Sequence, residues 1–379
     1  MALLCGGSLA SLIQLTPLMR ALRERSPHLH LLAVVRTDTA PLLQETDLVD
    51  RLLALPPAAW TGGPRAWLPV ARSARRWVER ALLERPTLCG VAWDHSPRLA
   101  RTGGAWLCRA GVPRRFGFIG EPAGLFTHVL PEPKPPAPPH RGTRHEALRL
   151  RSLMNALGLH GFECSPDIAL RREERQWARH ALTEAGLDPS RPIVAVNPTA
   201  DHRLKEWPAP RIAELLDRLA EDAQRVILAW GPRARRAGRV VPISSGCPDT
   251  VGIPVLAATR DPRELAAILA RCAVLVTGDA DPMHLATAVG TPVVALYGPT
   301  NPEWFGPLGR QHQILRHPVA CSPCAHDERV PPCPNRHACM QGLETEPVLR
   351  AVRAALRARA TAPAGHTGCE EAARTRPGG

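Results

Sequence analysis

Short β-branched or apolar runs alternate with helical stretches from the first residues onward, and this alternation constrains the fold more than any other feature. Repeated strand and helix segments are typical of βαβ units, which build parallel sheets. The strands expected in the second half of the chain are residues 193–197, 225–231, 273–279 and 292–298. The sequence therefore predicts an α/β fold.

The first half follows the same pattern. Its expected strands are residues 2–5, 30–35, 88–94 and 115–118. An amphipathic helix is expected over residues 15–25, where Leu15, Leu18, Met19 and Leu22 repeat at helical spacing. Residues 121–142 contain too many prolines for a helix or a central strand, so we expect a loop there.

A chain of 379 residues is long enough for two domains. A helical pattern at residues 171–186 precedes the second α/β series, which places the boundary nearby. We expect domains at 1–165 and 166–360, the second closed by a helix near 346–358. The tail 361–379 lacks apolar periodicity and is expected to be disordered.

The formal charge of +13 suits an anionic partner, but nearly all of it is arginine and resembles compositional drift. Aromatic residues make up 4%, which argues against a platform for single-stranded nucleic acid, and no nucleic-acid partner is expected. No stretch approaches the ~20 apolar residues of a membrane-spanning helix, and the first residues lack the pattern of a secretory signal. These features predict a cytoplasmic protein, either soluble or peripheral to a membrane.

The segment 276–309 reads as strand, turn, helix, strand and loop. A strand that ends at Gly278-Asp279 and leads into a helix at Pro282 would place backbone amides and the positive helix end where phosphate binds in α/β folds. The alternative is structural, with Asp281 simply capping that helix. Local sequence supports both interpretations.

A second strand, loop and helix spans residues 193–219, with Lys205 just before Trp207-Pro208. A lysine in such a loop is usually a solvated surface charge, although it can contact phosphate. Lysine occurs only here and at Lys134, while arginine is abundant. That contrast favours a functional role for Lys205.

Four of the eleven cysteines crowd together at Cys321, Cys324, Cys333 and Cys339. Paired thiols at this spacing are typical of tetrahedral zinc, and four thiolates would make the site structural rather than catalytic. The alternatives are a reduced loop with incidental cysteines, or disulfides in an oxidising compartment. Structural zinc is the favoured interpretation.

Taken in order, these segments resemble glycosyltransferase family 9, the lipopolysaccharide heptosyltransferases. The resemblance rests on TPLMRALRERSPHLHLLAVV, RAGVPRRFGF, NPTADHRLKEWP and GDADPMHLATAVGTPVVALYGPTNP. It implies a GT-B architecture, with two Rossmann-like domains facing across a cleft. It also implies an inverting transferase that moves a heptose-like sugar from an ADP-linked donor to a lipopolysaccharide or other lipid-linked envelope saccharide, without a catalytic metal.

The resemblance also assigns residues. The donor-binding positions are Thr199, Ala200, Lys205, Asp279, Ala280, Asp281, Met283 and His284. The catalytic base of the family falls on Ser11, whose hydroxyl cannot accept a proton near neutrality. Asp281 replaces a glycine of the family's turn, and Arg233 to Arg235 replace an acidic nucleotide contact. Asp38, Asp94 and Glu121 are other candidates for the base.

These departures leave two functions open. The chain is a heptosyltransferase with a modified site, or a catalytically weakened homologue that serves as a nucleotide- or sugar-binding or assembly protein. A nucleic-acid-binding protein is a third class, and it would show affinity that falls steeply with salt.

Overall fold

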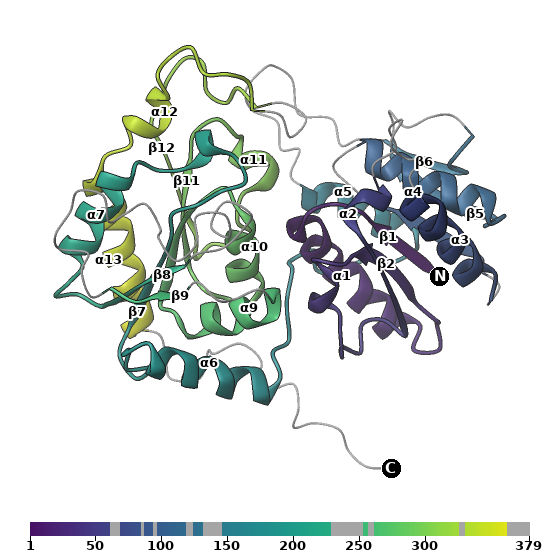
Figure 1. Cartoon of the computed structure of the whole chain (residues 1–379), viewed down its shortest axis with the longest axis horizontal. Coiled ribbons are helices and arrows are strands. Elements are labelled where there is room, and N and C mark those ends of the chain that lie inside the picture. Colours follow the sequence, from purple (N-terminus) through teal and green to yellow (C-terminus); the bar gives the residue numbers. More distant parts are fainter. Residues whose placement is uncertain are drawn as a thin grey trace. The chain divides into compact units, whose positions relative to one another are not determined.

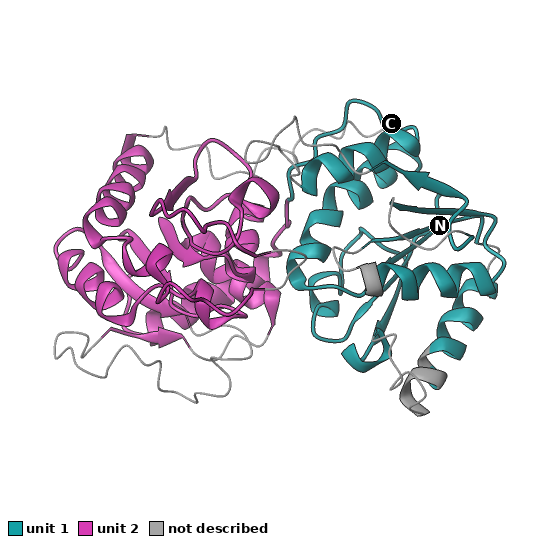
Figure 2. Ribbon diagram, turned by 90° about the horizontal axis from the view of Figure 1, so that it is seen from above, with its two compact units in different colours: residues 1–166 teal, residues 167–379 magenta. Residues whose placement is uncertain are grey.

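The computed structural model describes residues 1–60, 69–84, 87–93, 97–118, 124–131, 146–228, 253–256, 261–325 and 330–361. The chain divides into two compact units, Met1–Pro166 and Asp167–Gly379 (Figure 2). The expected tail lies outside the described residues except for Thr361, and the expected loop at 121–142 is described only over 124–131.

The first unit is built on a parallel six-stranded sheet in the order β3-β2-β1-β4-β5-β6. The strands are β1 (Ala2–Cys5), β2 (Leu32–Arg36), β3 (Arg51–Leu55), β4 (Cys89–Ala92), β5 (Arg114–Phe118) and β6 (His128–Leu130). The helices are α1 (Leu9–Arg25), α2 (Pro57–Trp60), α3 (Pro69–Leu83), α4 (Pro97–Arg109) and α5 (Glu146–Ala156), with a 3₁₀ turn η1 (Ala40–Leu42). This strand order is that of a Rossmann fold.

The second unit repeats the order, as β12-β11-β10-β7-β8-β9. The strands are β7 (Ile193–Asn197), β8 (Gln224–Leu228), β9 (Val255–Leu256), β10 (Val274–Gly278), β11 (Val293–Tyr297) and β12 (Gln313–Arg316). The helices are α6 (Arg172–Glu184), α7 (Ala209–Arg218), α9 (Pro262–Arg271), α10 (Asp281–Ala288), α11 (Pro302–Phe305), α12 (Ala338–Gln341) and α13 (Thr345–Thr361), with a 3₁₀ turn η3 (Arg203–Lys205). Both units therefore confirm the α/β class.

Helices cover both faces of the second sheet. Figure 1 shows α7 and α13 on one side and α9 and α10 on the other, and α7 packs against α13 while α9 packs against α6 and α10. Val194, Val196 and Val276 join the core on the α7 and α13 side. Because side chains alternate along a strand and both faces are buried, the central strands are apolar throughout.

Several elements differ from the sequence-based expectation. The helix α1 begins at Leu9 rather than residue 15, because Ser8 caps it and accepts a hydrogen bond from the Ser11 amide. Strand β6 lies within the expected loop, at the edge of its sheet, where neighbouring prolines are tolerated. Strands β3, β9 and β12 were not expected. None of the helices that the structure describes is both long and apolar enough to cross a membrane.

Candidate functional site

The two central strands of the second sheet, β7 and β10, end side by side. Asn197 at the end of β7 is paired with Thr277, and its side-chain amide donates to the Thr277 hydroxyl at 3.0 Å and to the Thr199 carbonyl at 2.8 Å. The order of connection reverses between these strands, and ligands of open α/β sheets bind at such a switch point, beyond the carboxyl ends of the strands. The two sequence motifs with donor-binding candidates therefore meet at one edge.

Lys205 crosses this edge. Its Nζ lies 3.2 Å from Asp279 Oδ2 and 3.1 Å from Asp201 Oδ1, and the side chains of Lys205 and Asp279 are only 14% and 11% exposed. Burial lowers the pKa of the Lys205 ammonium, but Asp279 and Asp201 outweigh this effect and raise it above its ordinary value. The lysine therefore stays protonated in a poorly solvated position.

The loop that carries Lys205 is held at several points. Trp207 is buried and donates its indole N–H to the Leu343 carbonyl at 2.9 Å. The Lys205 carbonyl lies against Gly278, where a Cβ would come within 2.6 Å of the oxygen. His337 Nε2 lies 2.5 Å from the Leu204 carbonyl. These contacts fix the lysine relative to the end of β10.

Helix α10 begins directly after Asp279. Ala280 is its N-cap and makes no side-chain capping bond, and Asp281 is the first helical residue. Asp281 therefore stands one position inside the helix rather than at its N-cap. Met283 and His284 are buried, and the Met283 sulfur lies 3.4 Å from the Tyr297 hydroxyl, so its side chain belongs to the core.

Three of the expected site residues, Thr199, Lys205 and Asp279, gather at the ends of the two central strands. Thr199 and Lys205 line one small cavity of about 10 Å³ together with Asn197 and Gly278, at the ends of the two strands. Asp279 joins this group through its ion pair with Lys205. Asn197 was not among the expected site residues, although a polar residue at the carboxyl end of an apolar strand was a usable signal. The arginines at 233–235 lie outside the described residues.

Ser11 lies in the first unit, in the opening turn of α1, and is 1% exposed. Its amide donates to the Ser8 hydroxyl at 3.4 Å, and the two hydroxyl oxygens are 3.5 Å apart. These contacts give Ser11 a place in the helix cap. Among the other candidates for a base, Asp38 pairs with Arg36 at 2.5 Å, while Asp94 and Glu121 lie outside the described residues.

Among the residues that the structure describes, which include Cys321, Cys324, Cys333 and Cys339, no three His, Cys, Asp or Glu side chains are grouped as metal ligands. Burial raises the pKa of Cys324, and the thiols of Cys321 and Cys333 add to this effect. The pKa of Cys339 is raised in the same way. Zinc binding stays a prediction from the cysteine spacing, and metal analysis of the purified chain would test it.

Comparison with known proteins identifies the family. The model of glycosyltransferase family 9 (heptosyltransferase) matches residues 102–333, which is more than half of the chain. The chain belongs to glycosyltransferase family 9. This match covers both donor-site motifs and ends within the cysteine cluster.

Curated relatives in the family align over part of their length. Lipopolysaccharide heptosyltransferase 2 of Escherichia coli (strain K12) is 28% identical over 211 residues, 55% of this chain and 60% of the relative. Lipopolysaccharide heptosyltransferase 3 of the same strain is 32% identical over 183 residues, 48% of this chain and 49% of the relative. The chain thus matches about half to three-fifths of these two enzymes.

Solved structures of family 9 proteins share the fold along nearly the whole chain. The glycosyl transferase family 9 protein from Veillonella parvula DSM 2008 superposes with a TM-score of 0.72 at 20% identity, covering 94% of this chain and 97% of that one. E. coli ADP-heptose lps heptosyltransferase II gives 0.68 at 20% identity, covering 95% and 99%. E. coli heptosyltransferase WaaC with ADP gives 0.66 at 16%, covering 94% and 100%. The expected GT-B fold is confirmed.

Proposed function

We propose that this family 9 protein transfers a heptose-like sugar from an ADP-linked donor to a lipopolysaccharide or other envelope saccharide, with inversion at the anomeric carbon. The observation that carries the proposal is Lys205, a protonated and largely shielded lysine at the switch point of the second sheet. The relatives are named for heptose transfer to lipopolysaccharide, and one of the similar structures contains ADP.

Lys205 would act on the diphosphate of the donor. As the bond to the sugar breaks, negative charge grows on the leaving phosphate, and a fixed ammonium stabilises it most strongly where water is excluded. Asp201 and Asp279 each contact the ammonium, so the diphosphate has to take the remaining N–H donor of Lys205 or displace one of the two carboxylates. The more exposed of the two is Asp201, whose side chain is 69% exposed.

The acceptor hydroxyl needs a base in this reaction, and Ser11 cannot supply one. The loss of general-base assistance typically lowers a rate by ~10²–10⁴. This favours the second candidate function, a weakened homologue that binds nucleotide or sugar without efficient turnover. The buried, hydrogen-bonded position of Ser11 in the α1 cap supports that alternative.

Thermal unfolding with ADP, UDP, GDP and ADP-heptose tests donor binding. A ligand at about 100 times its Kd adds about 2.7 kcal/mol to stability. We expect a rise in Tm for ADP and ADP-heptose that Lys205→Met abolishes and Lys134→Met preserves. If no nucleotide raises the Tm, the chain is neither an ADP-heptose transferase nor a nucleotide-binding homologue.

Transfer assays then separate the two functions. Product formed from ADP-heptose by the wild-type chain, and not by Lys205→Met, supports the transferase. Binding of ADP-heptose without turnover supports the weakened homologue. We place the protein in the cytoplasm, peripheral to the inner membrane, where a lipid-linked acceptor would be available.

A further inference from the structure

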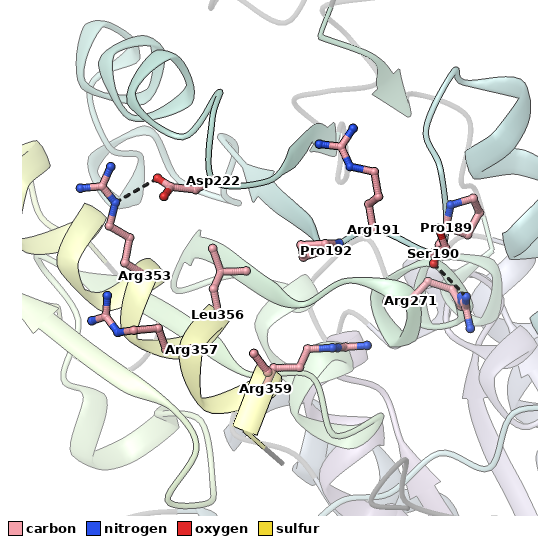
Figure 3. A pocket seen from close by; sticks show the side chains of 11 residues that line it. Pro189, Ser190, Arg191, Pro192, Asp222, Arg271, Arg353, Leu356, Arg357 and Arg359 are labelled. Atoms are coloured by element: carbon pink, nitrogen blue, oxygen red, sulfur yellow. Dashed lines mark hydrogen bonds and ion pairs between the residues drawn. The ribbon is translucent and has the colours of Figure 1, made fainter. Parts of the chain in front are cut away.

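A second pocket lies at the opposite edge of the second sheet from Lys205. It has a volume of about 480 Å³, within the ordinary range for small-molecule sites. Its walls are the loop before β7, the turn before β8, the end of α9 and the last turns of α13 (Figure 3). The lining residues include Pro189, Asp222 and Leu356.

Arginine dominates the lining. Among the described residues, the pocket is lined by Arg191, Arg271, Arg353, Arg357 and Arg359, and by one acidic residue, Asp222. Figure 3 shows three of these side chains projecting from α13 and Arg191 extending from the loop before β7. Asp222 neutralises Arg353 alone, through a contact of 2.9 Å. The pocket therefore keeps an excess of positive charge.

Three of the guanidinium groups have N–H donors that make no hydrogen bond to any residue that the structure describes. Arg191 and Arg357 make no ion pair with any residue that the structure describes. Arg271 donates to the Pro189 carbonyl at 3.2 Å, but its Nε is buried and has no partner in the described part of the chain. Buried donors are rarely left unsatisfied in proteins, so this N–H group would gain from an acceptor bound in the pocket.

The charges also oppose one another. Burial lowers the pKa of Arg271, and the neighbouring Arg179 and Arg359 lower it further. An anion in the pocket would relieve this repulsion. Guanidinium groups bind phosphate through two parallel hydrogen bonds, and arginine keeps its charge across the physiological range.

We propose that this pocket binds a small phosphate-bearing anion, either a soluble phosphate compound or the headgroup of an anionic lipid. The site is separate from the proposed donor site. Pro192 of the pocket precedes β7, whereas Asn197 of the donor site ends it, and five strand residues span about 16 Å. The two sites therefore lie at opposite ends of the same strand.

Calorimetric titration of the full chain with inorganic pyrophosphate tests the pocket. The Lys205→Met background removes the anion-binding lysine of the donor site, and we expect pyrophosphate to bind in that background. The double variant Arg191→Met/Arg357→Met should weaken pyrophosphate binding about tenfold or more, because it removes two of the charged donors that line the pocket. Both side chains are exposed, so the fold should tolerate the change.

Arg350→Met is the matched control. Arg350 lies on α13, like Arg357, but it is not part of the pocket lining. Its side chain is 68% exposed and pairs with Glu346, so its loss should leave the Kd for pyrophosphate unchanged. Equal Kd values for the double variant and its parent would overturn the proposal, as would absence of binding at millimolar pyrophosphate.

Vesicle sedimentation identifies the source of the phosphate. Phosphatidylcholine vesicles with and without phosphatidic acid are compared for the parent chain and the double variant. Capture that requires both phosphatidic acid and the two arginines assigns the pocket to a lipid headgroup. Pyrophosphate binding without such capture assigns it to a soluble phosphate compound.

Discussion

Lys205 and Asp279 form a shielded ion pair of 3.2 Å that joins the loop after β7 to the end of β10. Asp201 contacts the same ammonium at 3.1 Å from the solvent side. The three groups together carry a net negative charge, so an incoming diphosphate has to compete with carboxylates that are already in place.

Removing the outer carboxylate should strengthen nucleotide binding. In Asp201→Asn the ammonium loses one of its two counterions, and we expect ADP to bind about two- to tenfold more tightly, with little change in stability. Calorimetry with ADP measures the effect. Asp47→Asn, an exposed change in the first unit, should have no effect, and weaker binding by the Asp201 variant would mean that Asp201 itself contacts the ligand.

A methyl group at Gly278 should displace the lysine loop. The added Cβ would lie 2.6 Å from the Lys205 carbonyl, and crowding of this kind costs about 1–3 kcal/mol. Gly278→Ala should therefore lower both the Tm and the affinity for ADP. Gly103→Ala in α4 of the first unit is the control, since its Cβ would meet the Ala92 side chain at 3.1 Å, and ADP binding should be unaffected.

The indole N–H of Trp207 should contribute to stability. Trp207→Phe leaves the Leu343 carbonyl without its donor, which should cost about 1–3 kcal/mol in urea unfolding. Trp177 on α6 is 37% exposed, so Trp177→Phe should change stability much less. Equal effects of the two variants would argue against a specific role for the Trp207 hydrogen bond.

Glu174 should make the second unit sensitive to acid. Burial raises the pKa of this carboxyl, but hydrogen bonds from Arg263 and Arg171 outweigh it and lower the pKa to about 2. Because the folded pKa lies below the unfolded value, the stabilisation is full above pH ~4.5 and is lost as pH falls toward 2.

We expect Glu174→Gln to lower the free energy of unfolding by about 1–3 kcal/mol at neutral pH. Below pH ~4.5 the free energy of unfolding should then change less with pH than it does in the wild type. Urea unfolding at several pH values measures both effects. The neighbouring Glu173 is exposed, and Glu173→Gln should keep the wild-type profile.

The central strands were predictable and the edges were not. Strand β7 matches its expected limits, because burial on both faces leaves a continuous apolar run. Strands β3 and β12 lie at sheet edges and are partly exposed, so their sequences carry a weaker signal. The early start of α1 depends on the Ser8 cap, which the apolar periodicity of that helix did not reveal.

The motifs of the donor site were predictable from their order, but the contacts between them were not. Lys205 meets Asp279 because β7 and β10 are neighbours in the sheet, and this adjacency follows from the strand order of the whole unit. Asp201 also reaches the ammonium, but the two residues lie in a loop and a 3₁₀ turn, where a spacing of four does not by itself predict an ion pair. The position of the α10 N-cap at Ala280 follows from the backbone conformation, which the sequence does not show.

The carboxylates beside Lys205 give the site an electrostatic threshold for selectivity. A monovalent anion such as chloride stabilises the Lys205 ammonium less than the two carboxylates do, so we expect it not to bind. A ligand with several negative oxygens held close together can match them. Abundant small anions should then leave the lysine unoccupied, so that it is available to a diphosphate even when that compound is scarce.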